Sequence, residues 1–201
     1  MVIMILHIYF INDNINLTQY ISDITTTSLN STSSMIHWFN LIDKKDYIID
    51  FGDKKVDVIT LLKSEIYATF RTNLETCYHN GIVYNDEEQK TELLYFTSIK
   101  SSVFVFDLYH KQFIKEIKTS SNLERLYGII QWNKNYILVS GATIPDIKVI
   151  DVKQKKCVGN IFIGHEDDFR CIRIIKHPKF GYSILTGGDD STIKLYKIKF
   201  I

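Results

Sequence analysis

The 201-residue chain has few cysteines, only two prolines and almost no excess charge. Its three cysteines, Cys77, Cys157 and Cys171, are an odd number without CxxC spacing. That pattern argues against a disulfide framework and a zinc site, and favours a reducing compartment, so we expect a cytoplasmic protein. Lysine and arginine total 24 against 23 acidic residues, and a net charge of +1 offers no bulk attraction for nucleic acid or an anionic membrane. Any partner is therefore expected to be recognised locally.

The chain also lacks an apolar run long enough for a membrane-spanning helix. Its most apolar stretch is the first eleven residues, MVIMILHIYFI, whereas a bilayer needs about 20. No lysine or arginine precedes this run, and Asn12, Asp13 and Asn14 follow it in place of a small-residue cleavage site. We therefore expect a buried strand here and neither a signal peptide nor a membrane anchor.

Helical periodicity is absent as well, although 45% of the residues are hydrophobic and can supply one ordinary core. Short runs of β-branched and aromatic residues recur instead, separated by polar turns. This pattern predicts an all-β fold.

A repeat organises these short runs. The segment YILVSGATIPDIKVID (136–151) aligns without a gap on YSILTGGDDSTIKLYK (182–197), at a shift of 46 residues. Similar strand-like runs end at residues 12, 60, 107, 151 and 197, so the spacing stays in the mid-forties. A period of this length with several short strands per unit is typical of β-propeller blades, whereas a β-solenoid would usually have shorter coils.

The last repeat, GHEDDFRCIRIIKHPKFGYSILTGGDDSTIKLYK (164–197), resembles a WD repeat. Gly164-His165, Thr186-Gly187, Asp190 and the strand 193–196 follow one another at the spacing of that family, and the preceding repeat matches it moderately. The resemblance implies a WD-repeat β-propeller. The repeats supply about four four-stranded blades, whereas the family commonly closes a ring of seven, so we expect either a small closed ring or an incomplete one. We expect a single domain over 1–201, with repeats at about 13–60, 61–107, 108–151 and 152–197 and a lone strand at 3–12.

The resemblance also implies a structural hydrogen-bond tetrad. Its members would be His165, Thr186, Asp190 and Tyr196, the last standing where the family has tryptophan. An imidazole held between a carboxylate and a hydroxyl satisfies polar groups that the turns bury. The preceding repeat keeps the hydroxyl at Ser140 but has Ile144 at the aspartate position and Lys118-Thr119 in place of Gly-His, so we expect no tetrad there.

Acidic residues surround the predicted tetrad in sequence. Glu166, Asp167, Asp168 and Asp189 are candidates for a charged rim that binds a protein or peptide partner. His and carboxylates can also hold a divalent cation, but a charged loop is the commoner meaning, so no metal or cofactor is expected. The basic stretch KQKK (153–156) falls at a strand junction, where lysines usually prevent unwanted strand pairing, so nucleic-acid binding is not expected either.

We therefore expect a non-catalytic interaction scaffold with no catalytic residues, an expectation that rests on the fold resemblance. One alternative is a structural subunit whose open blade edges are completed by another chain or by self-association. A less favoured alternative is a propeller hydrolase, which would need histidines and carboxylates from several blades.

Overall fold

The structure is a computed structural model in which every regular element is a β-strand over the residues it describes. Those residues are 4–10, 18–24, 34–52, 54–63, 65–71, 78–86, 90–120, 124–141, 146–179 and 181–197. Within these ranges there is no helix of the length and apolarity that crossing a membrane requires.

Five antiparallel sheets make up this part of the chain. The first four-stranded sheet, sheet I, contains β3 (Ser34–Asn40), β4 (Lys45–Phe51), β5 (Val56–Thr60) and β6 (Ile66–Phe70). Sheet II contains β7 (Tyr78–Asp86), β8 (Thr91–Ser98), β9 (Ser102–Asp107) and β10 (Gln112–Lys118). Sheet III contains β11 (Leu126–Gln131), β12 (Tyr136–Gly141), β13 (Asp146–Asp151) and β14 (Lys156–Phe162). Sheet IV contains β15 (Phe169–His177), β16 (Gly181–Gly188) and β17 (Ile193–Lys197), and a separate ladder pairs β1 (Met4–Phe10) with β2 (Thr18–Ile24).

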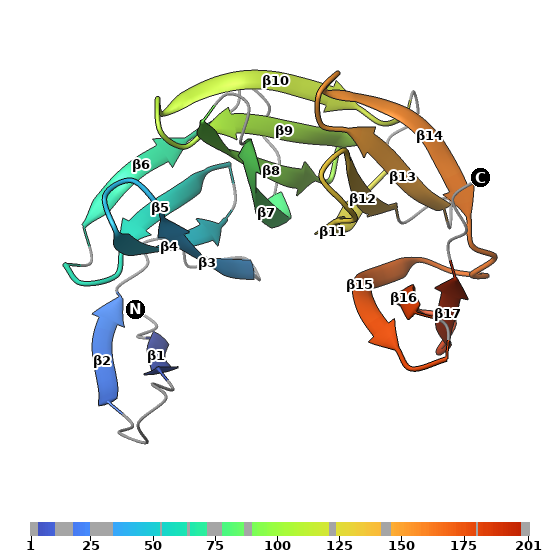
Figure 1. The fold of residues 1–201 in the computed structure, drawn as a ribbon, viewed down its shortest axis with the longest axis horizontal. Coiled ribbons are helices and arrows are strands. Elements are labelled where there is room, and N and C mark those ends of the chain that lie inside the picture. The colour runs from blue at the N-terminus through green and yellow to red at the C-terminus, as the bar shows by residue number, and fades with distance from the viewer. Residues whose placement is uncertain are drawn as a thin grey trace.

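Sheets I to IV follow one another around an open arc (Figure 1). The first strands face the concave side, where β7 packs against β3 and β11, and β11 packs against β15. The fourth strands β10 and β14 lie on the convex side (Figure 1). This arrangement of radial sheets confirms the predicted all-β propeller architecture, and of the two predicted ring geometries the chain adopts the incomplete one.

Three sheets have the four strands that the repeats predict, and sheet IV has three within the described residues. Each predicted repeat from 61 onward runs from the fourth strand of one sheet to the third strand of the next, as in 61–107, which spans β6 to β9. The repeat boundaries stay a prediction. The predicted lone strand 3–12 falls on β1 and on residues outside the described ranges.

Apolar side chains fill the space between successive sheets. The core between sheets I and II is aromatic, and its rings stack or meet edge to face, as Phe96 does with Phe104 at 5.5 Å and with Tyr78 at 5.0 Å. The cores between sheets II and III and between III and IV are mainly aliphatic. Middle strands such as β9, with all six residues buried, are covered on both faces, which explains their continuous apolar sequence.

A buried polar residue recurs near the end of the second strand in each sheet. The four residues are 0 to 4% exposed: Asp50, Thr97, Ser140 and Thr186. In sheets II and III the hydroxyl ties the second strand to the first, because Thr97 donates to the Asn80 carbonyl at 3.2 Å and Ser140 accepts from the Gly128 amide at 2.6 Å. In sheet IV the equivalent hydroxyl, that of Thr186, bonds His165 instead.

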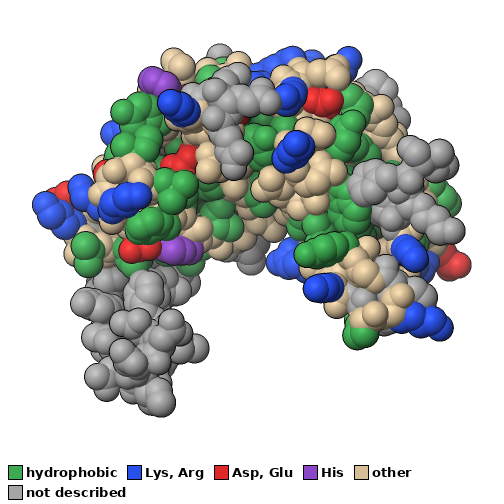
Figure 2. Space-filling model, in the orientation of Figure 1, with side chains coloured by type: hydrophobic (Ala, Val, Ile, Leu, Met, Phe, Trp, Pro, Cys, Tyr) green, Lys and Arg blue, Asp and Glu red, His purple; other side chains and the backbone are tan. Residues whose placement is uncertain are grey.

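The outer face and free edge of sheet IV carry apolar side chains that are exposed in this structure. Ile193 is 77% and Leu195 38% exposed on β17, and the Cys171 thiol on β15 is exposed as well. This is the place where the predicted completion of an open blade by another chain would occur, and that completion stays a prediction. Figure 2 shows lysine and arginine side chains at several separate places on the side of the molecule that it draws.

Glycine is required where sheets I and II approach most closely. A Cβ atom on Gly81 would lie 2.3 Å from Cζ of Phe51 and 3.0 Å from the Tyr95 carbonyl oxygen. Phe51 is fully buried, and the contacting atom of Tyr95 is a backbone oxygen. Neither atom can therefore move away without disturbing the packing. Gly159, on β14, has no atom within 4 Å of the same position.

We therefore predict that Gly81→Ala lowers the free energy of unfolding by about 1–3 kcal/mol, the usual cost of overpacking. Gly159→Ala is the matched control and should leave stability unchanged or raise it by up to about 1 kcal/mol, because alanine restricts the unfolded chain. Urea unfolding of the three proteins measures both effects. Equal stability of the two variants would contradict the packing described for sheets I and II.

Candidate functional site

Two connections meet at one end of sheet IV, and together they hold most of the predicted site residues. Residues 163–168 join β14 to β15, and residues 189–192 join β16 to β17. The Asp189 amide donates to the Asp168 carbonyl at 2.7 Å, which fastens one connection to the other. Because the strands are antiparallel, both connections lie at the opposite strand end from the β13–β14 turn.

His165 is the centre of a buried hydrogen-bonded group in this site. Its Nδ1 lies 2.8 Å from Oδ2 of Asp190, and its Nε2 lies 2.8 Å from Oγ1 of Thr186. A carboxylate can only accept, so Nδ1 donates to Asp190, and Nε2 shares the second hydrogen bond with the Thr186 hydroxyl. His165 and Thr186 are 3% and 1% exposed. The structure thus brings His165, Asp190 and Thr186 of the predicted tetrad together around one ring.

Asp190 connects this buried group to the loop backbone. Its carboxylate accepts from the Glu166 amide at 3.2 Å, from the Thr192 amide at 3.0 Å and from the Thr192 hydroxyl at 2.7 Å. Burial opposes ionisation, but the hydrogen bonds from Thr192, His165 and Glu166 outweigh it and hold the pKa of Asp190 well below its usual value. One carboxylate therefore fixes both connections.

The two adjacent glycines of this turn are explained by close contacts. A Cβ atom on Gly188 would lie 2.9 Å from Nδ1 of His165 and 2.9 Å from Oδ1 of Asp190, so any larger residue would separate the pair. A Cβ atom on Gly187 would lie 2.9 Å from Sγ of Cys171. The imidazole of His165 also stacks on the Phe169 ring, with 5.7 Å between the ring centroids and 5° between the ring planes.

Tyr196 joins the group through the loop backbone and through Thr186. Its hydroxyl donates to the carbonyl of Ile163, two residues before His165, and it also lies within hydrogen-bonding reach of the Thr186 hydroxyl. Burial raises the pKa of the Tyr196 phenol, and the neighbouring Thr186 hydroxyl opposes that rise. The phenol hydroxyl therefore reaches the start of the loop 163–168 and anchors it there.

Two further residues of the site were not identified from the sequence. The hydroxyl of Thr192 donates to Asp190, and its Oγ1 also lies 3.2 Å from Nδ1 of His165. Lys194 donates to the Gly164 carbonyl, and its Nζ lies 3.8 Å from Oδ2 of Asp190. The contact with Thr192 had a recognisable signal, since an aspartate in a turn commonly accepts from the backbone amide two residues on. Lys194 had none, because a lysine on a strand usually points to solvent.

Sheet III has a different polar group at the corresponding place. Thr119, at the position of His165, donates to the Ser101 carbonyl at 3.0 Å, and Ser140 accepts from the Gly128 amide. Ile144 lies outside the described residues. Lys148, which corresponds to Lys194 at the repeat spacing of 46, is itself buried.

Lys148 lies between two buried carboxylates. Its Nζ is 2.9 Å from Oδ1 of Asp146 and 3.2 Å from Oε2 of Glu124, and all three residues are at most 5% exposed. Burial alone would lower the pKa of Lys148, but the two carboxylates raise it above its usual value. Burial raises the pKa of Glu124 in spite of the lysine. The Glu124 backbone also bonds Ser101 of sheet II, so the group joins two sheets.

The predicted rim residues differ in what they can offer a partner. Glu166 and Asp167 are exposed, and Asp168 is half-buried. Asp189 is paired with Arg170, whose Nε and Nη2 lie 2.8 and 2.6 Å from Oδ2 of that carboxylate. This pair is exposed, so it contributes little to stability, but it neutralises Asp189. The free negative charge of the rim therefore lies on 166–168.

The chemistry available to this site is limited by its geometry. Both ring nitrogens of His165 are engaged and the ring is buried, so it is not placed to bind a substrate or a metal. Over the described residues no group of three or more His, Cys, Asp and Glu side chains has an arrangement that could hold a metal ion. The site combines a rigid buried group with exposed carboxylates above it.

The two lysines give a direct comparison of a buried with a partly exposed ion pair. We predict that Lys148→Met lowers the free energy of unfolding by about 3–5 kcal/mol, because two carboxylates stay buried without a cation. Lys194→Met should cost about 0–1 kcal/mol, since its side chain is 30% exposed and pairs at 3.8 Å. Chemical unfolding of both variants measures the difference, and a larger loss for Lys194→Met would contradict this account.

The lowered pKa of Asp190 gives a pH dependence with a defined sign. The carboxylate stabilises the fold above the unfolded pKa of 3.8, and the contribution is lost as the pH falls toward the lower folded pKa. We predict that Asp190→Asn is less stable than the natural protein near neutral pH, and that the gap narrows below about pH 4. Thermal unfolding of both proteins across this range measures the gap. A gap that stays constant into acid would show that Asp190 is not the titrating group.

Comparison with known proteins agrees with this geometry. The chain is 28% identical over 174 residues to the "Ribosome biogenesis protein WDR12 homolog" of Aedes aegypti, which covers 83% of this chain and 36% of that protein. Two structures of polycomb repressive complex 2, one in the basal state and one from Chaetomium thermophilum, each contain a chain that superposes with a TM-score of 0.68 at 14% identity. Each match covers 84% of this chain and 37% of the other.

No family model matches the chain. The chain spans a little over a third of the length of the relatives it matches, so their activities and partners do not transfer with the fold. What the superposed chains share with this one is the fold. The resemblance to the WD-repeat β-propeller family is thereby confirmed, and the chain has the fold of that family.

Proposed function

We propose that the chain is a non-catalytic interaction scaffold that binds a basic protein or peptide segment at the rim formed by residues 166–168. The observation that supports this most directly is the position of two exposed carboxylates, Glu166 and Asp167, on a loop that a buried group holds in place. Exposed charge on a rigid support is what electrostatic recognition requires.

The rigidity of the loop favours binding. Ordering a flexible loop on association costs free energy that has to be recovered from contacts. Here the Glu166 amide is already bonded to Asp190, and the Asp168 carbonyl to the Asp189 amide. The acidic side chains therefore start from a loop whose backbone is fixed before the partner arrives.

The surroundings of His165 support a scaffold over an enzyme. Histidine commonly acts as a general base, but it must reach the substrate to do so. His165 is 3% exposed, and its two nitrogens are used by Asp190 and Thr186. Its role in this proposal is to fix the rim.

The comparisons support participation in a protein assembly. The matched structures are, by their titles, of polycomb repressive complex 2, and the sequence relative is described as a ribosome biogenesis protein. We extend from them only the general role of a subunit that contacts other proteins. The identity of the partner, the exclusion of nucleic acid and membranes, and the cytoplasmic location stay predictions.

A charge reversal on the rim tests this function. We predict that a fluorescein-labelled peptide rich in lysine and arginine binds the natural protein, and that Glu166→Lys weakens binding about tenfold. The substitution keeps the backbone amide that Asp190 accepts from, so the loop should stay in place. Fluorescence anisotropy measures the affinity of each protein.

The matched control is Glu65→Lys, an equal charge change at an exposed residue between β5 and β6. It should change the affinity less than about twofold. Equal losses in both variants would show that binding depends on net charge rather than on the rim, and unchanged binding in Glu166→Lys would remove the rim from the proposal.

A further inference from the structure

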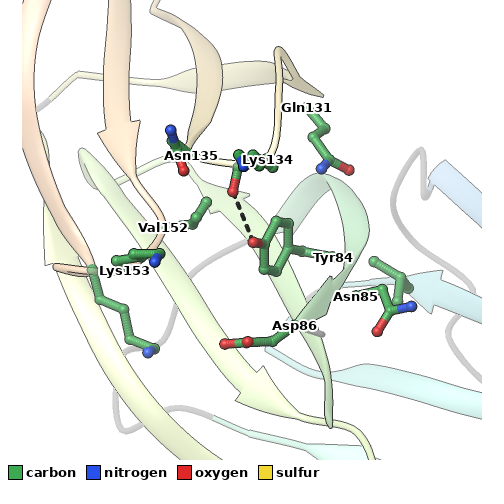
Figure 3. A pocket seen from close by; sticks show the side chains of 10 residues that line it. Tyr84, Asn85, Asp86, Gln131, Lys134, Asn135, Val152 and Lys153 are labelled. Atoms are coloured by element: carbon green, nitrogen blue, oxygen red, sulfur yellow. Dashed lines mark hydrogen bonds between the residues drawn. The ribbon is translucent and has the colours of Figure 1, made fainter. Parts of the chain in front are cut away.

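A pocket of about 750 Å³ opens between sheets II and III (Figure 3). It lies on the side of the β13–β14 turn, the opposite end of β14 from the acidic rim. Its volume falls within the range of ordinary ligand sites. The residues that line it come from the end of β7 and from the β11–β12 and β13–β14 turns: Val83, Tyr84, Asn85, Asp86, Gln131, Lys134, Asn135, Val152, Lys153 and Lys155.

Two tyrosines of sheet II hold the walls of this pocket. The Tyr84 hydroxyl donates to the carbonyl of Lys134 at 2.8 Å, as Figure 3 shows, and the Tyr95 hydroxyl donates to the carbonyl of Val152 at 3.3 Å. Tyr84 is 8% exposed and Tyr95 fully buried. Both turns of sheet III are therefore fixed against sheet II, and the lysines that follow project from anchored backbone.

The lining is basic in a chain that is nearly neutral. Among the described residues of the lining, three lysines, Lys134, Lys153 and Lys155, stand beside one carboxylate, Asp86. Lys134 and Lys153 are exposed, whereas Lys155 is half-buried in a left-handed turn conformation with φ of 48°. The sequence predicts that the lysines of 153–156 protect a strand junction, whereas the structure places two of them around a cavity.

The other lining groups suit a polypeptide. Asn85, Gln131 and Asn135 supply amide donors and acceptors that match a peptide backbone. The valines of the lining belong to the cores on either side, since Val83 packs between sheets I and II and Val152 is 3% exposed between sheets II and III. We propose that this pocket binds an acidic peptide segment of a partner protein, with carboxylates on the lysines and backbone groups on the amides.

The same features disfavour a nucleic acid as the occupant. Sites for single strands combine basic grooves with exposed aromatic rings on which bases stack. The aromatic ring of this lining is Tyr84, which is buried and whose hydroxyl already bonds Lys134. The described lining residues also include no arginine, the residue best suited to bidentate phosphate contacts.

A short fluorescein-labelled peptide rich in glutamate is the probe for this site. We predict that the natural chain binds it, and that Lys134→Gln with Lys153→Gln weakens binding at least about tenfold, measured by fluorescence anisotropy. The control pair, Lys63→Gln with Lys115→Gln, changes net charge equally at exposed positions outside the pocket and should cost less than about twofold. Circular dichroism and melting of each variant check that the fold is kept.

Three results would overturn the proposal. The first is an equal loss in both double variants, which would assign binding to general charge. The second is tighter binding of a labelled oligothymidylate that the pocket variant abolishes, which would make the site one for nucleic acid. The third is no binding of the acidic probe by the natural chain.

The pocket and the acidic rim are independent in this test. Glu166→Lys should leave the affinity for the acidic peptide unchanged, and the pocket variant should leave the affinity for a basic peptide unchanged. Failure of the pocket can therefore be told apart from failure of the proposed rim function.

Discussion

The faces that successive sheets bury against one another place the polar groups of their turns beside an apolar core, and those groups need partners inside the protein. In sheet IV the hydrogen bond between His165 and Asp190 meets this need, since Asp190 also accepts from Glu166 and Thr192. The position of the acidic loop follows from this shared carboxylate. Without the Asp190 carboxylate, one buried imidazole and two loop amides would lose their acceptor at once.

Sheets III and IV satisfy the buried polar groups of their turns with different side chains. Sheet IV uses the hydrogen-bonded group around His165, whereas sheet III uses the buried ions Lys148, Asp146 and Glu124. The ions of sheet III are the more sensitive to substitution, because a buried ion group is costly to break even where it adds little net stability. The acidic loop 166–168 and the lysines of the pocket lie at opposite strand ends of the sheets. In our proposals this separation lets the chain contact two partners without bringing their charges into conflict.

Much of the architecture was predictable, because strand alternation and a period in the mid-forties are local signals. His165, Thr186 and Asp190 were identified by their spacing, and the structure brings them together. The bond from Tyr196 to the Ile163 carbonyl depends on the reach of a phenol, which spacing does not encode. Lys148 and Arg170 were missed because a lysine or arginine on a strand gives no sign of being buried or paired. The lysine pocket joins turns about 50 residues apart, so only the packing of sheets II and III reveals it.

Hydrogen exchange of the loop amides tests the central claim most directly. The Glu166 amide donates to Asp190 and the Asp189 amide to the Asp168 carbonyl, although the loop lies at the surface. We predict that both amides exchange far more slowly than an unfolded chain, and that Asp190→Asn accelerates the exchange at Glu166. Exchange of the Glu166 amide at the unfolded rate in the natural protein would contradict the claim that the buried His165–Asp190 pair holds the rim.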